Sequence, residues 1–367
     1  MKYYLIAGEA SGDLHGSNLI ICLKKLDDKG IFRCWGGDKM QAAGATLVEH
    51  FCNMAFMGFV EVIKNIRTIL GFFHVCKKDI LEFKPDVLIL LDYPGFNLRM
   101  AKWAKKQGIK VVYYITPQVW AWHKSRVHTL GKQTDLLLVI LPFESSFFSK
   151  YGYKTTFVGH PLLDALSDFN PDTTTIDALL PSKNILALLP GSRKQEIKTM
   201  LPIMLEACHD LDFQVVIAGA PSIDDALYHE IIENAGFAFP PLIIRNQTYT
   251  LLSLSQFALV SSGTATLETA LFGVPQIVCY KGNAISYQIA RKLIDLKYIS
   301  LVNLIADKEV VKELIQNDLT PENLRKGLFN LKINAEKIKD DYRQIRQLLG
   351  KEGASQRAAS EIIKILT

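Results

Sequence analysis

The sequence predicts an α/β protein of two Rossmann-like, doubly wound domains, on three observations. The chain has 367 residues, which suits two domains of roughly 150–200 residues better than one core. Short apolar runs rich in Val, Ile and Leu alternate with helical patterns, which is typical of parallel strands covered on both faces. The stretch Ser167–Lys183 breaks this rhythm with Asp, Asn, Pro and Thr, so we expect a linker there.

The expected strands fall on both sides of this linker. Those of the first half are Tyr3–Ala7, Val87–Leu91, Val111–Ile115 and Leu136–Leu141. Those of the second half are Ile185–Leu189, Val215–Ala218, Leu242–Ile244, Phe257–Val260 and Gln276–Cys279. Alternation with helices predicts right-handed β-α-β units. We therefore expect an N-terminal domain over 1–166, a C-terminal domain over 184–350, and a last helix over 354–367 that packs back or onto a partner.

Composition excludes several classes of protein. The net charge of +5, from 42 basic and 37 acidic residues, is too small an excess to indicate a nucleic-acid partner. Six cysteines without a C-x-x-C pair are typical of free, buried thiols in a reducing compartment. The first apolar run is too short for a signal peptide, and no run of about 18 uncharged apolar residues predicts a membrane span. Neither H-E-x-x-H nor a cysteine cluster occurs, so we expect no metal, and we expect no cofactor.

Polar residues follow the first expected strand, in the motif from Gly8 to Gly16. Its three glycines, four residues apart, would let the backbone approach a ligand at a helix N-terminus. Their spacing is not that of a dinucleotide fingerprint. An ordinary capped turn would explain the glycines but not so many polar side chains. The candidates here are Glu9, Ser11, Asp13 and His15.

Two further motifs follow strands of the first half. Asp92 comes directly after a buried strand, where a carboxylate can serve as a general base; helix capping is the alternative. Asn97 lies in the same motif and is a candidate acceptor-binding residue. The segment Thr116–Lys124 carries Gln118, Trp120 and Trp122. Aromatic faces of this kind suit a sugar ring or an acyl chain, although packing at the core edge is nearly as good an explanation for each tryptophan.

Two motifs of the second half indicate a phosphate-containing ligand. Backbone N–H groups and a guanidinium suit phosphate oxygens, and a helix start with a surface arginine is the alternative for the first motif. The corresponding residues after the strand Ile185–Leu189 are Gly191, Ser192 and Arg193, and those after Phe257–Val260 are Ser262, Gly263, Thr264 and Ala265. Glu268 comes one helical turn after Thr264, where a carboxylate suits a ribose diol.

The segment Met54–Val75 predicts a wide apolar helix surface. Its charges Glu61, Lys64 and Arg67 form one narrow stripe on a helix. The remaining bulky residues, Phe59 and Ile66 among the outward ones, would suit acyl chains or a bilayer boundary. A helix buried on two sides is the alternative.

Taken in order, these five motifs resemble the lipid-A-disaccharide synthase family over nearly the whole chain. The resemblance extends to Phe143-Glu144, Phe157–Pro161 and Leu301–Leu304, the last of which adds Asn303 as a candidate donor-binding residue. It implies a glycosyltransferase B-type fold with the two sheets facing a crevice. It also implies inverting, metal-independent transfer from UDP-2,3-diacylglucosamine to 2,3-diacylglucosamine 1-phosphate, giving a β-1,6 disaccharide phosphate and UDP. Such enzymes resemble peripheral membrane homodimers with exchanged C-terminal segments, in the cytoplasm at the inner membrane of a Gram-negative bacterium.

One departure from the family pattern leaves the catalytic base open. The family often has D-x-P-D-F-N in the second motif, and here Gly95 replaces the second acid. Asp92, Glu9, Asp13 and His15 therefore compete for the role. Other functions considered are a UDP-N-acetylglucosamine 2-epimerase on the same scaffold and a non-catalytic UDP-sugar sensor. The missing dinucleotide fingerprint counts against an NAD-dependent oxidoreductase.

Overall fold

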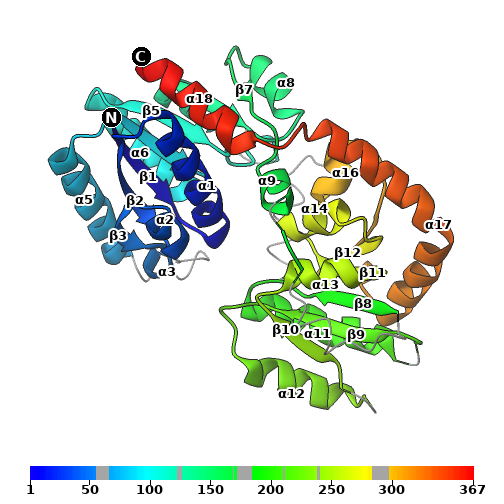
Figure 1. Cartoon of the computed structure of the whole chain (residues 1–367). Coiled ribbons are helices and arrows are strands. Elements are labelled where there is room, and N and C mark those ends of the chain that lie inside the picture. Colours follow the sequence, from blue (N-terminus) through cyan, green and yellow to red (C-terminus); the bar gives the residue numbers. More distant parts are fainter. Residues whose placement is uncertain are drawn as a thin grey trace. The chain divides into compact units, whose positions relative to one another are not determined.

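The structure, a computed structural model, describes residues 1–54, 66–121, 126–167, 169–171, 184–209, 211–237, 240–282 and 297–367. These residues form two compact α/β units (Figure 1). One comprises 1–167 together with 349–367, and the other comprises 168–348. Most of the expected linker, residues 168 and 172–183, lies outside the described residues.

The first unit contains a seven-stranded sheet in the order β3-β2-β1-β4-β5-β6-β7, in which every pair is parallel. The strands are β1 (Lys2–Ala7), β2 (Ile31–Gly36), β3 (Thr46–His50), β4 (Val87–Leu91), β5 (Lys110–Tyr114), β6 (Leu136–Val139) and β7 (Thr156–Phe157). β1 and β4 are neighbours whose last residues, Ala7 and Leu91, are paired. The loops that leave these two strands therefore start side by side.

Helices follow the strands of this sheet, and the last helix of the chain joins them. They are α1 (Ala10–Leu26), α2 (Asp38–Ala42), α3 (Phe51–Met54), α5 (Ile66–Phe83), α6 (Pro94–Lys106), α7 (Arg126–Gln133), α8 (Glu144–Ser149), α9 (Leu162–Ser167) and α18 (Ala354–Leu366). α18 packs against α1 (Figure 1). Its N-terminus is fixed by Asp164, whose carboxylate accepts from the backbone N–H groups of Gly353, Ala354 and Ser355.

The second unit repeats this topology in a six-stranded parallel sheet, ordered β10-β9-β8-β11-β12-β13. Its strands are β8 (Ile185–Leu189), β9 (Gln214–Gly219), β10 (Leu242–Arg245), β11 (Phe257–Ser261), β12 (Gln276–Tyr280) and β13 (Lys312–Ile315). Its helices are α11 (Lys194–Cys208), α12 (Asp225–Ala235), α13 (Thr248–Leu254), α14 (Thr264–Leu271), α16 (Leu301–Ala306), η1 (Gln316–Asp318) and α17 (Pro321–Leu348). Leu189 at the end of β8 pairs with Val260 of β11, so these two strands also release their loops side by side.

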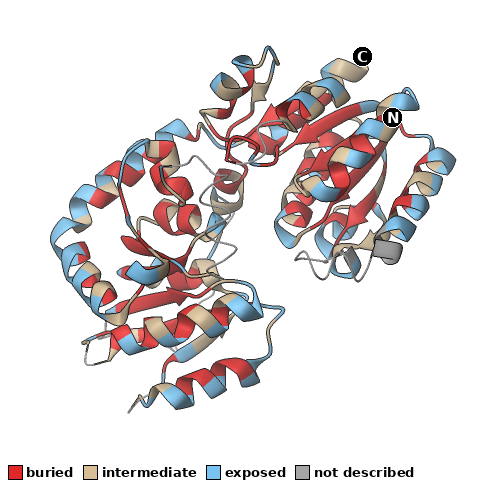
Figure 2. Ribbon diagram, turned by 180° about the vertical axis from the view of Figure 1, so that it is seen from behind, coloured by how far each residue is buried: buried red, intermediate tan, exposed pale blue. Residues whose placement is uncertain are grey.

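All nine expected strands are present within one or two residues of the expected bounds, and the doubly wound α/β class is confirmed. The sequence did not predict β2, β3, β7 and β13. Three of these lie at sheet edges, where one side is uncovered and a continuous apolar run is not needed. β2 is interrupted by Arg33, which pairs with Asp79 of α5. In both units the strands are mostly buried (Figure 2).

The apolar segment Met54–Val75 is only partly described, and that part corrects the expectation of lipid contact. Phe73 is buried and its ring stacks on Phe96 at 4.3 Å. Phe72 is half-buried and meets the edge of Trp35. Both aromatics therefore belong to the core, as the alternative predicted, whereas Leu70 is exposed. Phe59 and the side chain of Ile66 lie outside the described residues.

Two other expectations concern thiols and the membrane. All six cysteines are free, but Cys52 is exposed and Cys22 is half-buried, so not all are buried as expected. Among the helices that the structure describes, none combines the length and the apolar character needed to cross a bilayer.

Candidate functional site

The candidate residues gather at one edge of each sheet, where the strand order reverses. In the first unit the reversal lies between β1 and β4, and in the second between β8 and β11. Ligands of open α/β sheets bind at such points, beyond the carboxyl ends of the strands. Glu9 and Asp92 follow β1 and β4, and the Gly191 and Gly263 loops follow β8 and β11. Each unit therefore carries its motifs where this topology places a ligand.

Asp92 occupies an unusual environment at the edge of the first sheet. Its φ is +42° and that of Tyr93 is +47°, so two successive non-glycine residues lie in the left-handed region. Burial, reinforced by the negative charge of Glu9, raises the pKa of the Asp92 carboxyl to about 7. A carboxylate with a pKa near the working pH can accept a proton and still be ionised in a large fraction of molecules.

The glycines of the first motif serve packing within the unit. A Cβ on Gly8 would lie 2.2 Å from the ring of Tyr93, and one on Gly16 would lie 2.8 Å from the sulfur of Met40. The third, Gly12, would come within 3.0 Å of the Cβ of Ala7. The expectation that these glycines admit a ligand is thus corrected, since they admit neighbouring side chains. Between them Ser11 is exposed and Glu9 is half-buried.

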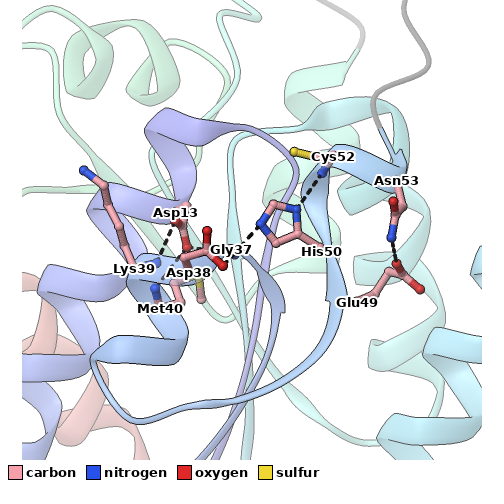
Figure 3. Close-up of polar contacts among 9 residues, drawn as sticks. All are labelled: Asp13, Gly37, Asp38, Lys39, Met40, Glu49, His50, Cys52 and Asn53. Atoms are coloured by element: carbon pink, nitrogen blue, oxygen red, sulfur yellow. Dashed lines mark hydrogen bonds and ion pairs between the residues drawn. The ribbon is translucent and has the colours of Figure 1, made fainter. Parts of the chain in front are cut away.

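Asp13 is committed to the backbone of the neighbouring loop. Its buried carboxylate accepts hydrogen bonds from the N–H groups of Gly37 at 2.8 Å, Lys39 at 3.1 Å and Met40 at 3.0 Å. Figure 3 shows these bonds at the start of α2, beside the separate contacts around His50. A carboxylate engaged in this way caps a helix, so Asp13 acts in structure and is a poor candidate for the base.

His15 is also a poor candidate. Burial lowers the pKa of its imidazole to about 4, and the pKa of the neighbouring His160 is lowered to about 3 for the same reason. A group with such a pKa is neutral near pH 7 but is a weak base. Of the four candidates, this leaves Asp92 with Glu9 beside it.

The Thr116 loop is held by a residue that sequence reasoning did not assign. The buried carboxylate of Glu144 accepts from Thr116 Oγ1 at 3.0 Å and from the N–H groups of Ile140 and Leu141 at 3.1 and 2.8 Å. Burial raises its pKa to about 7. Trp120 is buried against Phe143, which favours the packing explanation. Gln118 is exposed and can meet a ligand, and Trp122 lies outside the described residues.

In the second unit a loop of Gly191, Ser192 and Arg193 leads from β8 into α11. Gly191 has a φ of +114°, which favours glycine. Glu196, which was not predicted, lies against this loop. Its carboxylate accepts from the N–H of Ser192 at 3.2 Å and pairs with Arg193 Nη1 at 2.7 Å. Glu196 thus occupies the donors that an anion would use, and it also orients the guanidinium.

The second loop, after β11, starts α14. Ser262 Oγ donates to the carbonyl of Ile299 at 3.3 Å, while Gly263 and Thr264 are exposed and Ala265 is half-buried. Burial raises the pKa of Glu268 to about 7. The Tyr249 phenol lies close enough for Glu268 to raise its pKa further. Tyr249 was not predicted, and only its proximity to Glu268 in the fold points to it.

Two amides expected at the site are buried in structural roles. Asn303 donates to the carbonyl of Val311 and to Glu313, and its side-chain oxygen accepts from the N–H groups of Val310 and Val311. Its bonding capacity is therefore used within the unit, and it does not contact a donor directly. Asn97 is fully buried, and it donates to the carbonyls of Leu91 and Asp92. These placements correct the expectation that either amide faces a substrate.

Within the described ranges, no group of three or more His, Cys, Asp or Glu side chains is arranged to hold a metal ion. That the reaction needs no metal stays a prediction.

Comparison with known proteins identifies the family. The profile of lipid-A-disaccharide synthetase matches residues 3–365. The lipid-A-disaccharide synthase of Syntrophus aciditrophicus (strain SB) is 41% identical, and the alignment covers 97% of this chain and 95% of that protein.

Solved structures support the fold alone, because their sequence identities are low. The UDP-GlcNAc 2-epimerase of Methanocaldococcus jannaschii, in complex with UDP-GlcNAc and UDP, is similar with a TM-score of 0.68 at 15% identity, over 99% of this chain and 100% of that one. The calicheamicin glycosyltransferase CalG4 is similar with a TM-score of 0.60 at 17% identity, over 99% and 98%. Because an epimerase and a glycosyltransferase share this fold, the sequence match decides between them, and the chain belongs to the lipid-A-disaccharide synthetase family.

Proposed function

We propose that this chain transfers 2,3-diacylglucosamine from UDP-2,3-diacylglucosamine to 2,3-diacylglucosamine 1-phosphate. The products are the β-1,6-linked disaccharide 1-phosphate and UDP. The observation that carries the proposal is the family match over residues 3–365. The clustering of candidate residues at the switch point of each sheet supports it.

In the first unit, Asp92 is the base for the acceptor. Its carboxylate takes the proton of the 6-hydroxyl as that oxygen attacks the anomeric carbon from the face opposite UDP. The C–O bond to UDP breaks as the new glycosidic bond forms, and the configuration inverts. The pKa of about 7 favours this role, because the base is ionised often enough and is still basic enough to accept the proton. The exposed Ser11 and Gln118 are the remaining candidates for acceptor contacts.

In the second unit, the loops after β8 and β11 bind the UDP part of the donor. Arg193 and the N–H groups near Gly191, Ser192 and Gly263 stabilise the charge that grows on the leaving diphosphate. For this to happen the diphosphate replaces Glu196 on Ser192 and Arg193. The Glu268 carboxylate accepts from the ribose hydroxyls, since none of the described residues is hydrogen-bonded to it.

Access to acylated substrates follows from association with a membrane surface, in the cytoplasm at the inner membrane. Leu70, Val75 and Leu81 of α5 are large apolar side chains exposed to solvent, and the same helix carries Lys77 and Lys78. An apolar helix face with basic residues suits an anionic bilayer boundary. A homodimer that exchanges α18 is a further part of the proposal.

The deciding experiment incubates the protein with both acylated sugars and follows the disaccharide phosphate and UDP by mass spectrometry. Stoichiometric formation of both products supports the proposal. Conversion of UDP-N-acetylglucosamine to its 2-epimer, without disaccharide, would replace it with the epimerase. Binding of UDP without turnover of either substrate would point to a non-catalytic UDP-sugar sensor.

A further inference from the structure

We propose that Tyr113 is a positioning residue for glycosyl transfer, because its hydroxyl holds the carbonyl of Asp92 and so fixes the left-handed backbone from which the Asp92 carboxylate projects. The inference rests on the proposed function in one respect, that Asp92 is the base. Tyr113 belongs to none of the five motifs, and only the fold brings it to Asp92.

The first support is local backbone strain. Asp92, Tyr93 and Ile115 have φ values of +42°, +47° and +64°. They follow the ends of β4 and β5, which are adjacent strands. A β-branched residue such as Ile115 rarely adopts a positive φ. Each such residue costs of order 1–3 kcal/mol and persists only where surrounding contacts enforce it. Such strain is concentrated at functional sites, and here it lies at the proposed base.

The second support is the set of contacts that enforces this conformation. Tyr113 Oη donates to the Asp92 carbonyl at 2.6 Å, and Asn97 Nδ2 donates to the same oxygen at 2.8 Å. The Asp92 N–H donates to the Ile115 carbonyl at 3.2 Å. Tyr113 and Asn97 are both completely buried. Burial raises the pKa of the Tyr113 hydroxyl well above its usual value, so the hydroxyl stays protonated and its donor role is permanent.

The third support is electrostatic. Glu9, from the loop after β1, raises the pKa of the Asp92 carboxyl, and the N–H of Tyr93 lowers it. From β5 the facing group is the neutral hydroxyl of Tyr113, whose own pKa is raised by Asp92 and lowered by Arg126 at the start of α7. A backbone that relaxes to an ordinary conformation would carry the carboxylate away from this setting. Its pKa would then fall towards that of an exposed aspartate.

The test compares Tyr113→Phe with Tyr114→Phe in the full-length protein. Both tyrosines lie on β5 and are completely buried. Only Tyr113 packs in the core cluster with Leu88 and Leu90, because successive side chains of a strand point to opposite faces. Each substitution removes one buried hydroxyl and leaves the ring. Measurements are kcat and KM for both substrates, kcat from pH 5 to 9, and the melting temperature.

We expect Tyr113→Phe to lower kcat by about 10- to 100-fold, the scale of a small misplacement of a reacting group, with an unchanged KM for the donor. The acid limb of kcat should move down by about one pH unit or more as the pKa of Asp92 falls. Tyr114→Phe should keep the wild-type kcat and limb, even if its melting temperature falls as far.

Equal effects of the two substitutions on kcat and on the limb would overturn the inference. If Tyr113→Phe does not fold, Asn97→Ala removes the second donor to the same carbonyl and should move the limb in the same direction. An unmoved limb in that variant, or the unfolding of both, would show that the contacts serve folding only. A wild-type protein that forms no disaccharide would refute the proposed function, whereas an active wild type with a silent Tyr113→Phe would refute only the positioning role.

Discussion

Replacing Asp92 by Asn tests the proposed base with little disturbance of the fold. Asn is among the residues that best tolerate a positive φ, and Asp92 has a φ of +42°. We expect kcat to fall by about 10²–10⁴, the usual contribution of general base catalysis, with unchanged UDP affinity. Asp38→Asn is a suitable control, because Asp38 is almost fully exposed in the same unit and lies 3.8 Å from His50.

The pH dependence supplies the magnitude. With a pKa of about 7, the ionised fraction of Asp92 rises from about one tenth at pH 6 to about nine tenths at pH 8, so wild-type kcat should rise roughly tenfold. If the base were His15, whose pKa is about 4, kcat would be flat over this range. A limb near pH 7 therefore indicates the carboxylate, whereas the unperturbed pKa of histidine had suggested the reverse assignment.

Stability gives an independent check on the same group. The pKa of Asp92 is raised from 3.8 to about 7 on folding, so ionisation of this group disfavours the folded state above pH 7. Asp92→Asn should therefore unfold at higher denaturant concentration than wild type at pH 8, and the gain should disappear as the pH falls to about 4. A flat kcat profile together with no stability gain at pH 8 would refute the reasoning about Asp92.

Four further predictions concern the rest of the site. Gly95→Asp should fold normally, because a Cβ there meets nothing within 4 Å, and it should restore part of the kcat of Asp92→Asn by supplying the acid of the family pattern; a double variant as inactive as the single one would contradict this. Arg193→Ala should weaken UDP binding by about 1.5–3 kcal/mol in calorimetry, and Glu268→Gln by the same or somewhat less; unchanged affinity in both would remove the donor site from the second unit. Excess chelator should leave kcat unchanged, and loss restored by magnesium would disprove metal independence. Leu70→Glu should reduce co-sedimentation with anionic vesicles and raise KM for the acylated acceptor at constant UDP affinity, and an unchanged fraction bound would place lipid contact elsewhere.

Several site residues were predictable because their chemistry is local in sequence. A carboxylate directly after a buried strand, as at Asp92, must lie at the carboxyl edge of the sheet. The Gly191–Arg193 run likewise has to start the helix that follows β8. The predictions that proved wrong share another feature. Asn303 and Asn97 have side chains suited to a ligand, but the fold supplies them with backbone partners first.

The sequence by itself determined the two-unit α/β architecture and the family, because periodic apolar runs and ordered motifs are properties of the chain. Only the tertiary structure decided which polar groups remain available for chemistry. Asp13, within the most polar motif, is used up by the loop at Gly37, while Tyr113, in an unremarkable strand, reaches the carbonyl of Asp92. The physical reason is that burial and hydrogen bonding depend on neighbours distant in sequence, and these neighbours set both the pKa of a carboxyl and the direction in which it points.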